Sequence, residues 1–403
     1  MKFCFTEIMG IKKLNDVDLT TFMSSFYKQK ASDKILLLSN RSKNEVRNML
    51  LNNDFLKREF GLSRMKYLKQ HSMLLFSTDH LEIEEQNQIK KLSDEVNNER
   101  ETKRIIDMFY NDLMITIKNL SILLSMGIWM VKDSNVQPRY IFLATGVNNY
   151  TSTFNIKLDY TNSEGKYVEV NLTKEEIECS KKMMTLLYEH VLNIKESGNK
   201  RPNIVDISEV NYFEINRQLS TNNPSFTKTL MLIQEARNQS FLASKVDKYI
   251  AALQCILAVS DDFTFNCSRI TAAYISKGKK EHSDIIDCIS KGYHIRSQVS
   301  HGKKIDEDKY NLERISKKLD GYLRRILKKA LLDKRFNYIS KDEENWVKIE
   351  FKKIAVSEFK DEYDNRKKDN RLAGIKRNIL GIDNVDTLLD IETALKNRIN
   401  ELL

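Results

Sequence analysis

The sequence predicts a mainly helical protein with a small β element: a mixed α+β N-terminal domain followed by a C-terminal antiparallel helical bundle. Three observations support this fold class. The chain has only three prolines and twelve glycines in 403 residues, so few residues break helices. Alternation of apolar and polar residues, which is typical of strands, occurs only in the first half. From residue 225 onward, the apolar residues follow a helical period.

A polar loop, Ser-Thr-Asn-Asn-Pro at residues 220–224, separates these two patterns. We therefore expect an α+β domain at 1–224, a bundle at 225–335 and a helical extension at 336–403. The first domain has no recognisable motif, and its expected role is substrate selection or sensing.

The elements of the first domain begin with two short apolar runs, Lys34–Ser39 and Met73–Ser77, which are strands or buried helix turns. A charged stretch, 81–104, then leads into an apolar pattern that ends at Val131. This pattern predicts one or two long helices.

A hairpin is the clearest β prediction. Residues 153–160 alternate apolar and polar side chains, a polar turn follows at 161–165, and a second apolar run spans 167–172. Tyr140–Thr145 is expected to add a third strand. Thr173 and Glu176 then form a capping-box pattern, which predicts a helix to about residue 195.

The bundle is expected to contain five helices, joined by short loops that favour antiparallel neighbours. A further helix is expected at 384–403. The five predicted ranges are 226–237, 239–259, 267–277, 283–301 and 307–332.

Composition excludes several classes of protein. The five cysteines are scattered without metal-ligand spacing, so neither a zinc site nor a disulfide framework is expected, and a cytoplasmic location fits. No cofactor-binding motif is present. No signal peptide is evident, and the longest apolar stretch is well short of the roughly twenty residues that span a bilayer. A formal charge of +10 permits, but does not require, a polyanionic partner such as RNA.

The candidate site lies on the predicted helix at 283–301, which Ser283 or a neighbour caps and Gly302 ends in a left-handed conformation. Arg296 falls within the apolar arc of this helix, where an unpaired guanidinium would be costly. His294, Ser297 and His301 form a polar stripe on the opposite face.

Arg296 and His301 are separated by about 140° around an ideal helix, so they do not share a face. The reach of arginine, fraying near Gly302, or a second protomer would be needed to bring them together. Chemically, histidine can move a proton to or from a ribose hydroxyl or a leaving oxygen. Arginine can hold a phosphate. On spacing alone, however, a histidine before glycine is more often just a helix C-terminus.

The run Tyr293-His-Ile-Arg-Ser-Gln-Val-Ser-His-Gly302 resembles the signature of Apea-like HEPN domains. Residues 247–255, 268–273 and 322–327 resemble the neighbouring helices of that family, so the resemblance covers about 226–335. The chain departs from the family at Gln254, where related sequences often carry a glutamate. Glu235, Asp261 or Asp262 would then have to supply the acidic partner of Arg296.

The resemblance implies a homodimer in which two Arg-x4-His motifs share a cleft and cleave RNA, such as tRNA, without a metal or other cofactor. Such proteins often act as toxins or in anti-phage defence. Carried over to this chain, Arg296 holds the phosphate, His301 is the general acid or base, and Ser297 assists. Tyr293 and Glu235 are candidate supporting residues, as is His294 from the polar stripe.

A basic segment follows the motif, and its Lys303, Lys304, Arg324 and Arg325 are candidate RNA-binding residues. Such a run is more often a solvated helix face. Two other interpretations stay open: a non-catalytic module that binds RNA, a nucleotide or a protein, which Gln254 favours, and a structural helical scaffold.

Overall fold

The computed structural model describes residues 2–20, 34–78, 99–145, 151–156, 158–187, 224–257, 259, 262–306 and 309–332. Residues 1–348 form one compact unit and residues 349–403 a second. The expected boundary at 224 follows a stretch outside the described residues and stays a prediction. The expected extension at 336–403, with its helix at 384–403, also lies outside them.

A six-stranded antiparallel sheet forms the centre of the N-terminal half, in the order β3-β4-β5-β1-β6-β7. Both short apolar runs are strands, and the third predicted strand, at Tyr140–Thr145, is confirmed within β6. The strand bounds are β1 Lys2–Met9, β3 Val17–Asp18, β4 Lys34–Leu38, β5 Ser72–Thr78, β6 Gln137–Thr145 and β7 Thr151–Asn155.

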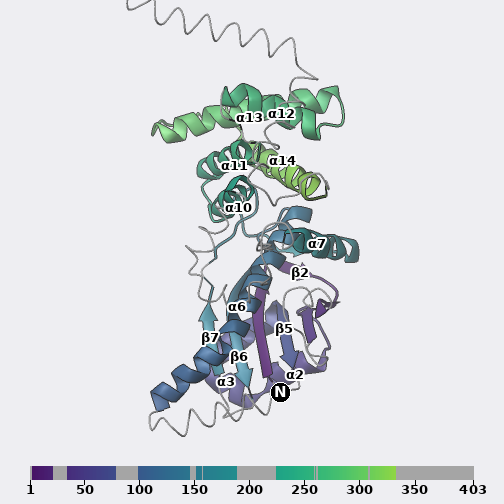
Figure 1. Cartoon of the computed structure of the whole chain (residues 1–403), viewed down its shortest axis with the longest axis vertical. Helices are drawn as coiled ribbons and strands as arrows, with labels where there is room; N and C mark the ends of the chain where they lie inside the picture. Colours follow the sequence, from purple (N-terminus) through teal and green to yellow (C-terminus); the bar gives the residue numbers. More distant parts are fainter. Residues whose placement is uncertain are drawn as a thin grey trace, which may run out of the picture. The chain divides into compact units, whose positions relative to one another are not determined.

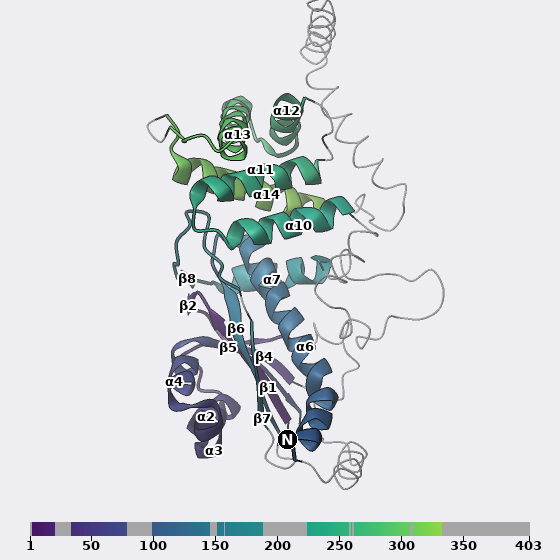
Figure 2. The same cartoon turned by 90° about the vertical axis from the view of Figure 1, so that its left-hand side faces the viewer.

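Helices cover both faces of this sheet (Figure 2). On one face, Phe3 and Phe5 of β1 belong to the core under three short helices. On the other, Cys4 and Ile8 of the same strand belong to the core under two longer helices. The short helices are α2 (Glu45–Asn52), α3 (Asp54–Phe60) and α4 (Leu62–Gln70), and the longer ones are α6 (Glu99–Val131) and α7 (Lys174–Leu187).

A β-bulge interrupts the pairing of β1 with β6. Thr6 pairs with Ile141 and Ile8 pairs with Pro138, so Arg139 and Tyr140 together lie opposite the single residue Glu7. Such an extra residue breaks the alternation of side chains between the two faces. Consequently, Arg139 and Tyr140 both contact the side of the sheet that carries α4.

The predicted hairpin is wrong. β7 pairs with β6, and β8 (Val170–Asn171) pairs in parallel with β2 (Ile11–Lys13). Between them the chain leaves the sheet: the backbone N–H of Thr161 donates to the Arg237 carbonyl at 2.7 Å. Tyr160 is fully buried, with its ring centroid 4.1 Å from Arg237 Cζ. A tertiary contact has therefore overridden a local alternating pattern, as often happens with strand propensity.

The capping box at the start of α7 is confirmed. The Thr173 hydroxyl accepts from the Glu176 N–H at 3.2 Å, and the Glu176 carboxylate accepts from the Thr173 N–H at 3.0 Å. α7 is described to Leu187; the predicted continuation to about 195 lies outside the described residues.

The C-terminal half contains the five predicted helices. They are α10 (Pro224–Arg237), α11 (Leu242–Ile256), α12 (Phe263–Ile275), α13 (Lys279–Ser300) and α14 (Leu312–Leu332). Together, Figures 1 and 2 show α12 and α13 running crosswise to α10, α11 and α14, so the helices form two crossed layers rather than one antiparallel bundle. α13 packs on both α11 and α12.

The two halves share a junction built on buried polar groups. The Asp320 carboxylate of α14 accepts from Trp129 Nε1 of α6 at 2.8 Å and from the Tyr249 hydroxyl of α11 at 3.1 Å. Arg237 is also fully buried, and its guanidinium donates to the carbonyls of Ser134 and Val136. Burial raises the pKa of Asp320 and lowers that of Arg237. These contacts join the two halves of the described chain, because they connect α6 and the segment after it to α10, α11 and α14.

In the described part of the chain, no helix combines the length and the apolar character that crossing a membrane requires.

Candidate functional site

The site lies at the C-terminal end of α13, where the chain stops in a Schellman motif. The Gly302 N–H donates to the Val299 carbonyl at 3.1 Å, and the Lys303 N–H donates to the Gln298 carbonyl at 2.9 Å. Gly302 has a φ of 63°, the left-handed conformation that this motif favours. The predicted end of the helix is thus confirmed. Its predicted start at Ser283 is wrong, because the helix begins one turn earlier, after Gly278.

Two residues of α11 anchor Arg296. Its Nη1 group donates to Gln254 Oε1, and its Nε lies 3.3 Å from Asp247 Oδ1. Asp247 and Gln254 are seven residues apart and therefore lie on one face of α11. The anchoring meets the requirement that a guanidinium near an apolar interface be paired. Arg296 retains 31% side-chain exposure, and within the described structure its Nη2 group makes no hydrogen bond.

Asp247 is therefore the acidic partner of Arg296. The expectation that Glu235, Asp261 or Asp262 would take this place was wrong. Glu235 instead pairs with Lys248 at 2.8 Å, so its supporting role is not seen. Asp262 is the N-cap of α12, and Asp261 lies outside the described residues. Spacing within one helix does not predict this partner, because Asp247 meets Arg296 only through the packing of α11 against α13.

Tyr293 of α13 lies close to Cys267 of α12 and to Gln254. Its buried hydroxyl has no hydrogen-bond partner among the described residues. Burial raises the pKa of the Cys267 thiol to about 12 and raises that of the Tyr293 hydroxyl. Because both groups stay neutral in the physiological range, neither can serve as an acid or a base there.

The polar stripe of α13 faces solvent. His294, Ser297 and His301 are all exposed. In the described residues, His301 makes no hydrogen bond or ion pair with Arg296. Arg296 and His301 therefore lie on different faces of α13, as their spacing predicts. One chain alone does not bring the two side chains together.

The basic residues beyond α13 divide into two groups. Lys303 and Lys304 are exposed in the turn directly after His301, where a polyanion could reach them. Arg324 and Arg325, by contrast, are engaged within the fold. Arg324 pairs with Asp320 at 2.7 Å, and Arg325 pairs with Glu281 at 2.6 Å. Contact of these two arginines with RNA stays a prediction, and it would compete with these ion pairs.

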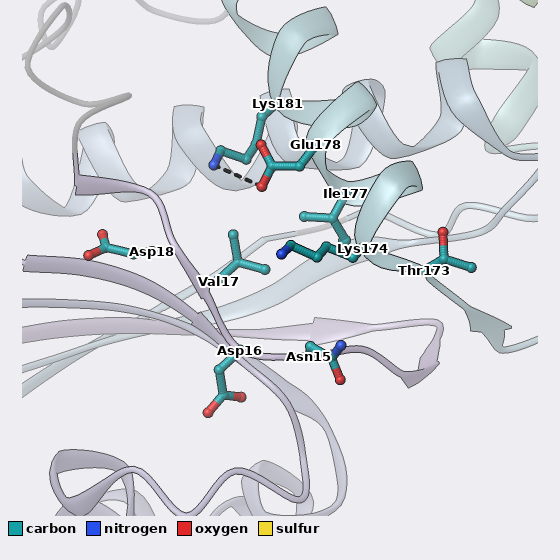
Figure 3. A pocket seen from close by; sticks show the side chains of 9 residues that line it. All are labelled: Asn15, Asp16, Val17, Asp18, Thr173, Lys174, Ile177, Glu178 and Lys181. Carbon is teal, nitrogen blue, oxygen red and sulfur yellow. Dashed lines mark hydrogen bonds and ion pairs between the residues drawn. The ribbon is translucent and has the colours of Figure 1, made fainter.

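No group of three or more potential metal ligands occurs among the described residues. A hollow of about 460 Å³ lies well away from α13, between the edge strand β3 and α7 (Figure 3). Within it, Lys181 pairs with Glu178 at 3.2 Å, Asp16 accepts from the Ser39 N–H at 2.8 Å, and Asp18 accepts from the Thr20 N–H at 2.7 Å. Lys174 also lines the hollow.

No family model matches the chain, and no curated protein or solved structure is significantly similar to it.

Proposed function

We propose that the chain is a metal-independent endoribonuclease of HEPN type, with Arg296 and His301 as its catalytic residues. The observation that supports this most is the anchoring of Arg296. Two of its nitrogens are held by Asp247 and Gln254, while Nη2 stays available and the side chain stays one-third exposed. A guanidinium fixed in this way is oriented to bind a phosphate with its remaining donors.

The proposed reaction uses the ribose 2′-hydroxyl as nucleophile. A histidine accepts the 2′-hydroxyl proton as the O2′–P bond forms, and the P–O5′ bond breaks as the 5′-oxygen gains a proton. The products are a 2′,3′-cyclic phosphate and a 5′-hydroxyl. Arg296 stabilises the charge that develops on the phosphoryl oxygens, Ser297 contributes a further hydrogen bond, and RNA is the only partner that the chemistry needs.

The site is proposed to form between two copies of the chain. Since His301 does not contact Arg296 within one chain, a homodimer that apposes the ends of two α13 helices would supply each phosphate with an arginine and a histidine. Sedimentation velocity on the full chain should then show a dimer. Mixing a His301→Ala chain with an Arg296→Ala chain should restore part of the activity that each variant lacks.

The test is cleavage of total RNA and tRNA in excess EDTA, with product ends analysed for cyclic phosphate. We expect His301→Ala and Arg296→Ala to lose about 100-fold or more of the activity, in the range that general acid–base catalysis contributes. His294→Ala is the matched control, because it removes another exposed imidazole from the same face of α13. Equal activity in wild type and His301→Ala would refute the proposal.

Gln254 favours a second candidate, a non-catalytic RNA-binding module. A neutral amide replaces the carboxylate that the family resemblance leads us to expect, so Arg296 is held with less negative charge nearby. This alternative predicts that RNA binding persists in both alanine variants while no preparation cleaves RNA. Restoring the carboxylate with Gln254→Glu would then be expected to leave the protein inactive.

A further inference from the structure

A second surface with the chemistry of a ligand site lies at the β-bulge, outside the Arg296 region. Its four residues are Arg64 and Tyr67 of α4 and Arg139 and Tyr140 of β6, which we call the bulge surface. Figure 2 shows α4 beside the sheet that contains β6.

The aromatic rings and guanidinium groups of this surface stack on one another. The Arg139 Cζ lies 5.9 Å from the Tyr67 ring centroid and 5.4 Å from that of Tyr140. The Arg64 Cζ lies 5.3 Å from the Tyr140 centroid. These are cation–π distances, and the bulge makes them possible because it directs two successive residues of β6 to the same side.

The two guanidinium groups have no carboxylate partner in the described part of the chain. The contact recorded for Arg139 beyond the rings is Nη1 to Met9 Sδ at 4.0 Å. Arg296, Arg324 and Arg325, in contrast, each pair with a carboxylate. α4 itself carries Arg64, Lys66 and Lys69 and no acidic residue, so the surface has unmatched positive charge.

A carboxylate does lie beneath this surface, but it is already paired with a histidine. The Glu7 side chain is 2% exposed, and its Oε1 lies 2.6 Å from Nδ1 of His71. The His71 ring in turn stacks on Tyr67, with an interplanar angle of 5° and centroids 6.1 Å apart. The Glu7–His71 pair therefore holds Tyr67 in position without cancelling the charge of the two arginines.

Tyr67 presents an aromatic ring to solvent, since the residue is 51% exposed. An anion alone would need the guanidinium groups but not an exposed ring beside them. A strand of nucleic acid offers both complements, because its phosphates match the arginines and its unpaired bases stack on aromatic rings and guanidinium planes. A duplex would match less well, because its base faces are already stacked.

We infer that the bulge surface binds single-stranded nucleic acid, with Tyr67 stacking on a base while Arg64 and Arg139 contact the phosphates. This inference does not depend on the proposed ribonuclease site. It gives the N-terminal half a role in holding a strand, whether or not the chain cleaves it.

The experiment is fluorescence anisotropy on the full chain with labelled 12-nucleotide strands. A 2′-O-methyl RNA strand, which lacks the nucleophile of the proposed cleavage, keeps binding separate from catalysis. A DNA strand of the same sequence and the corresponding duplex complete the set of probes. The variants are Tyr67→Leu and Arg64→Gln, both on the exposed side of α4. The matched controls are Tyr167→Leu, at another exposed tyrosine, and Arg58→Gln, on the neighbouring helix α3.

We expect wild type to bind single strands more tightly than the duplex, and Tyr67→Leu to bind about tenfold more weakly, as loss of a stacked base predicts. Arg64→Gln should weaken binding and reduce its salt dependence, while both controls bind as wild type does. Circular dichroism checks that each variant is folded, and Arg64→Gln provides the test if Tyr67→Leu is not. The inference is overturned if wild type binds neither single strand, if it prefers the duplex, or if the controls weaken binding as much as the variants.

Discussion

Gly302 is the residue on which the end of α13, and therefore the position of His301, most directly depends. Its φ of 63° is costly for a residue with a Cβ, although no atom lies within 4 Å of the position where a Cβ would be. Gly302→Ala should lower the free energy of unfolding by about 1 kcal/mol and reduce any RNA cleavage by displacing His301. Gly278→Ala, in open space at the other end of the helix and without a positive φ, should change neither. Chemical denaturation of both variants tests this, and equal stability would contradict it.

His71 gives a pH dependence that can be assigned to one residue. Its hydrogen bond with Glu7 raises the pKa of His71 above the ordinary value of 6.5. The stabilisation is therefore fully present below pH 6.5 and is lost as the pH rises through the folded-state pKa. The difference in unfolding free energy between wild type and His71→Gln should shrink from pH 6 to pH 8. Urea titrations across this range measure it, and a constant difference would rule out the assignment.

At the scale of elements, two helical glycines mark close approaches of different kinds. A Cβ on Gly292 of α13 would lie 2.7 Å from the flexible end of Ile250, whereas a Cβ on Gly127 of α6 would lie 2.8 Å from the backbone carbonyl of Ser180. Alanine improves helix propensity by about 1 kcal/mol at either position. We expect Gly292→Ala to be nearly neutral, because Ile250 can move.

Gly127→Ala is expected to destabilise by about 1–3 kcal/mol, because backbone cannot yield as a side chain does. Thermal unfolding of the two variants provides the comparison. Combining Gly292→Ala with Ile250→Val, which removes the contacting methyl group, gives the internal check. If Gly127→Ala is as stable as wild type, α6 and α7 do not approach as closely as described.

For the whole molecule, Asp320 connects α6, α11 and α14 at one point. Asp320→Ala would leave Trp129, Tyr249 and Arg324 without their acceptor, so we expect a loss of about 3–5 kcal/mol. Glu281→Ala is the matched control, since it removes the carboxylate partner of the adjacent arginine, Arg325, at a side chain that is 36% exposed. That change should cost at most about 1 kcal/mol. Similar losses in the two variants would show that the junction does not depend on Asp320.

The sequence predicted those parts of the molecule that local patterns determine. All five helices of the second half, the capping box at Thr173 and the left-handed Gly302 are set by helical period and by end signals, which act within a few residues. β1 was not predicted, because a central strand buried on both faces does not alternate. The predicted hairpin does not form because Tyr160 packs against Arg237, a residue 77 positions away in the chain.

The candidate site was predictable to the same limited extent. The spacing of Arg296 and His301 on one helix predicts that the two side chains lie on different faces. The partner of Arg296 could not be predicted in this way, because Asp247 meets it only where α11 and α13 cross. The bulge surface could not be predicted from the sequence for a similar reason. The β-bulge is an irregularity of strand pairing, and the spacing of Arg139 and Tyr140 does not indicate it.

Trp129 places an optical reporter at the junction of the two halves. The chain has two tryptophans, Trp129 and Trp346, so a Trp346→Phe chain would emit from Trp129 alone. The buried indole, bonded to Asp320, should fluoresce at shorter wavelength than an indole in water. Any ligand that separates the halves would shift this emission to the red. The same buried contact that holds the fold together thus lets a titration with RNA show, without a label, whether binding loosens it.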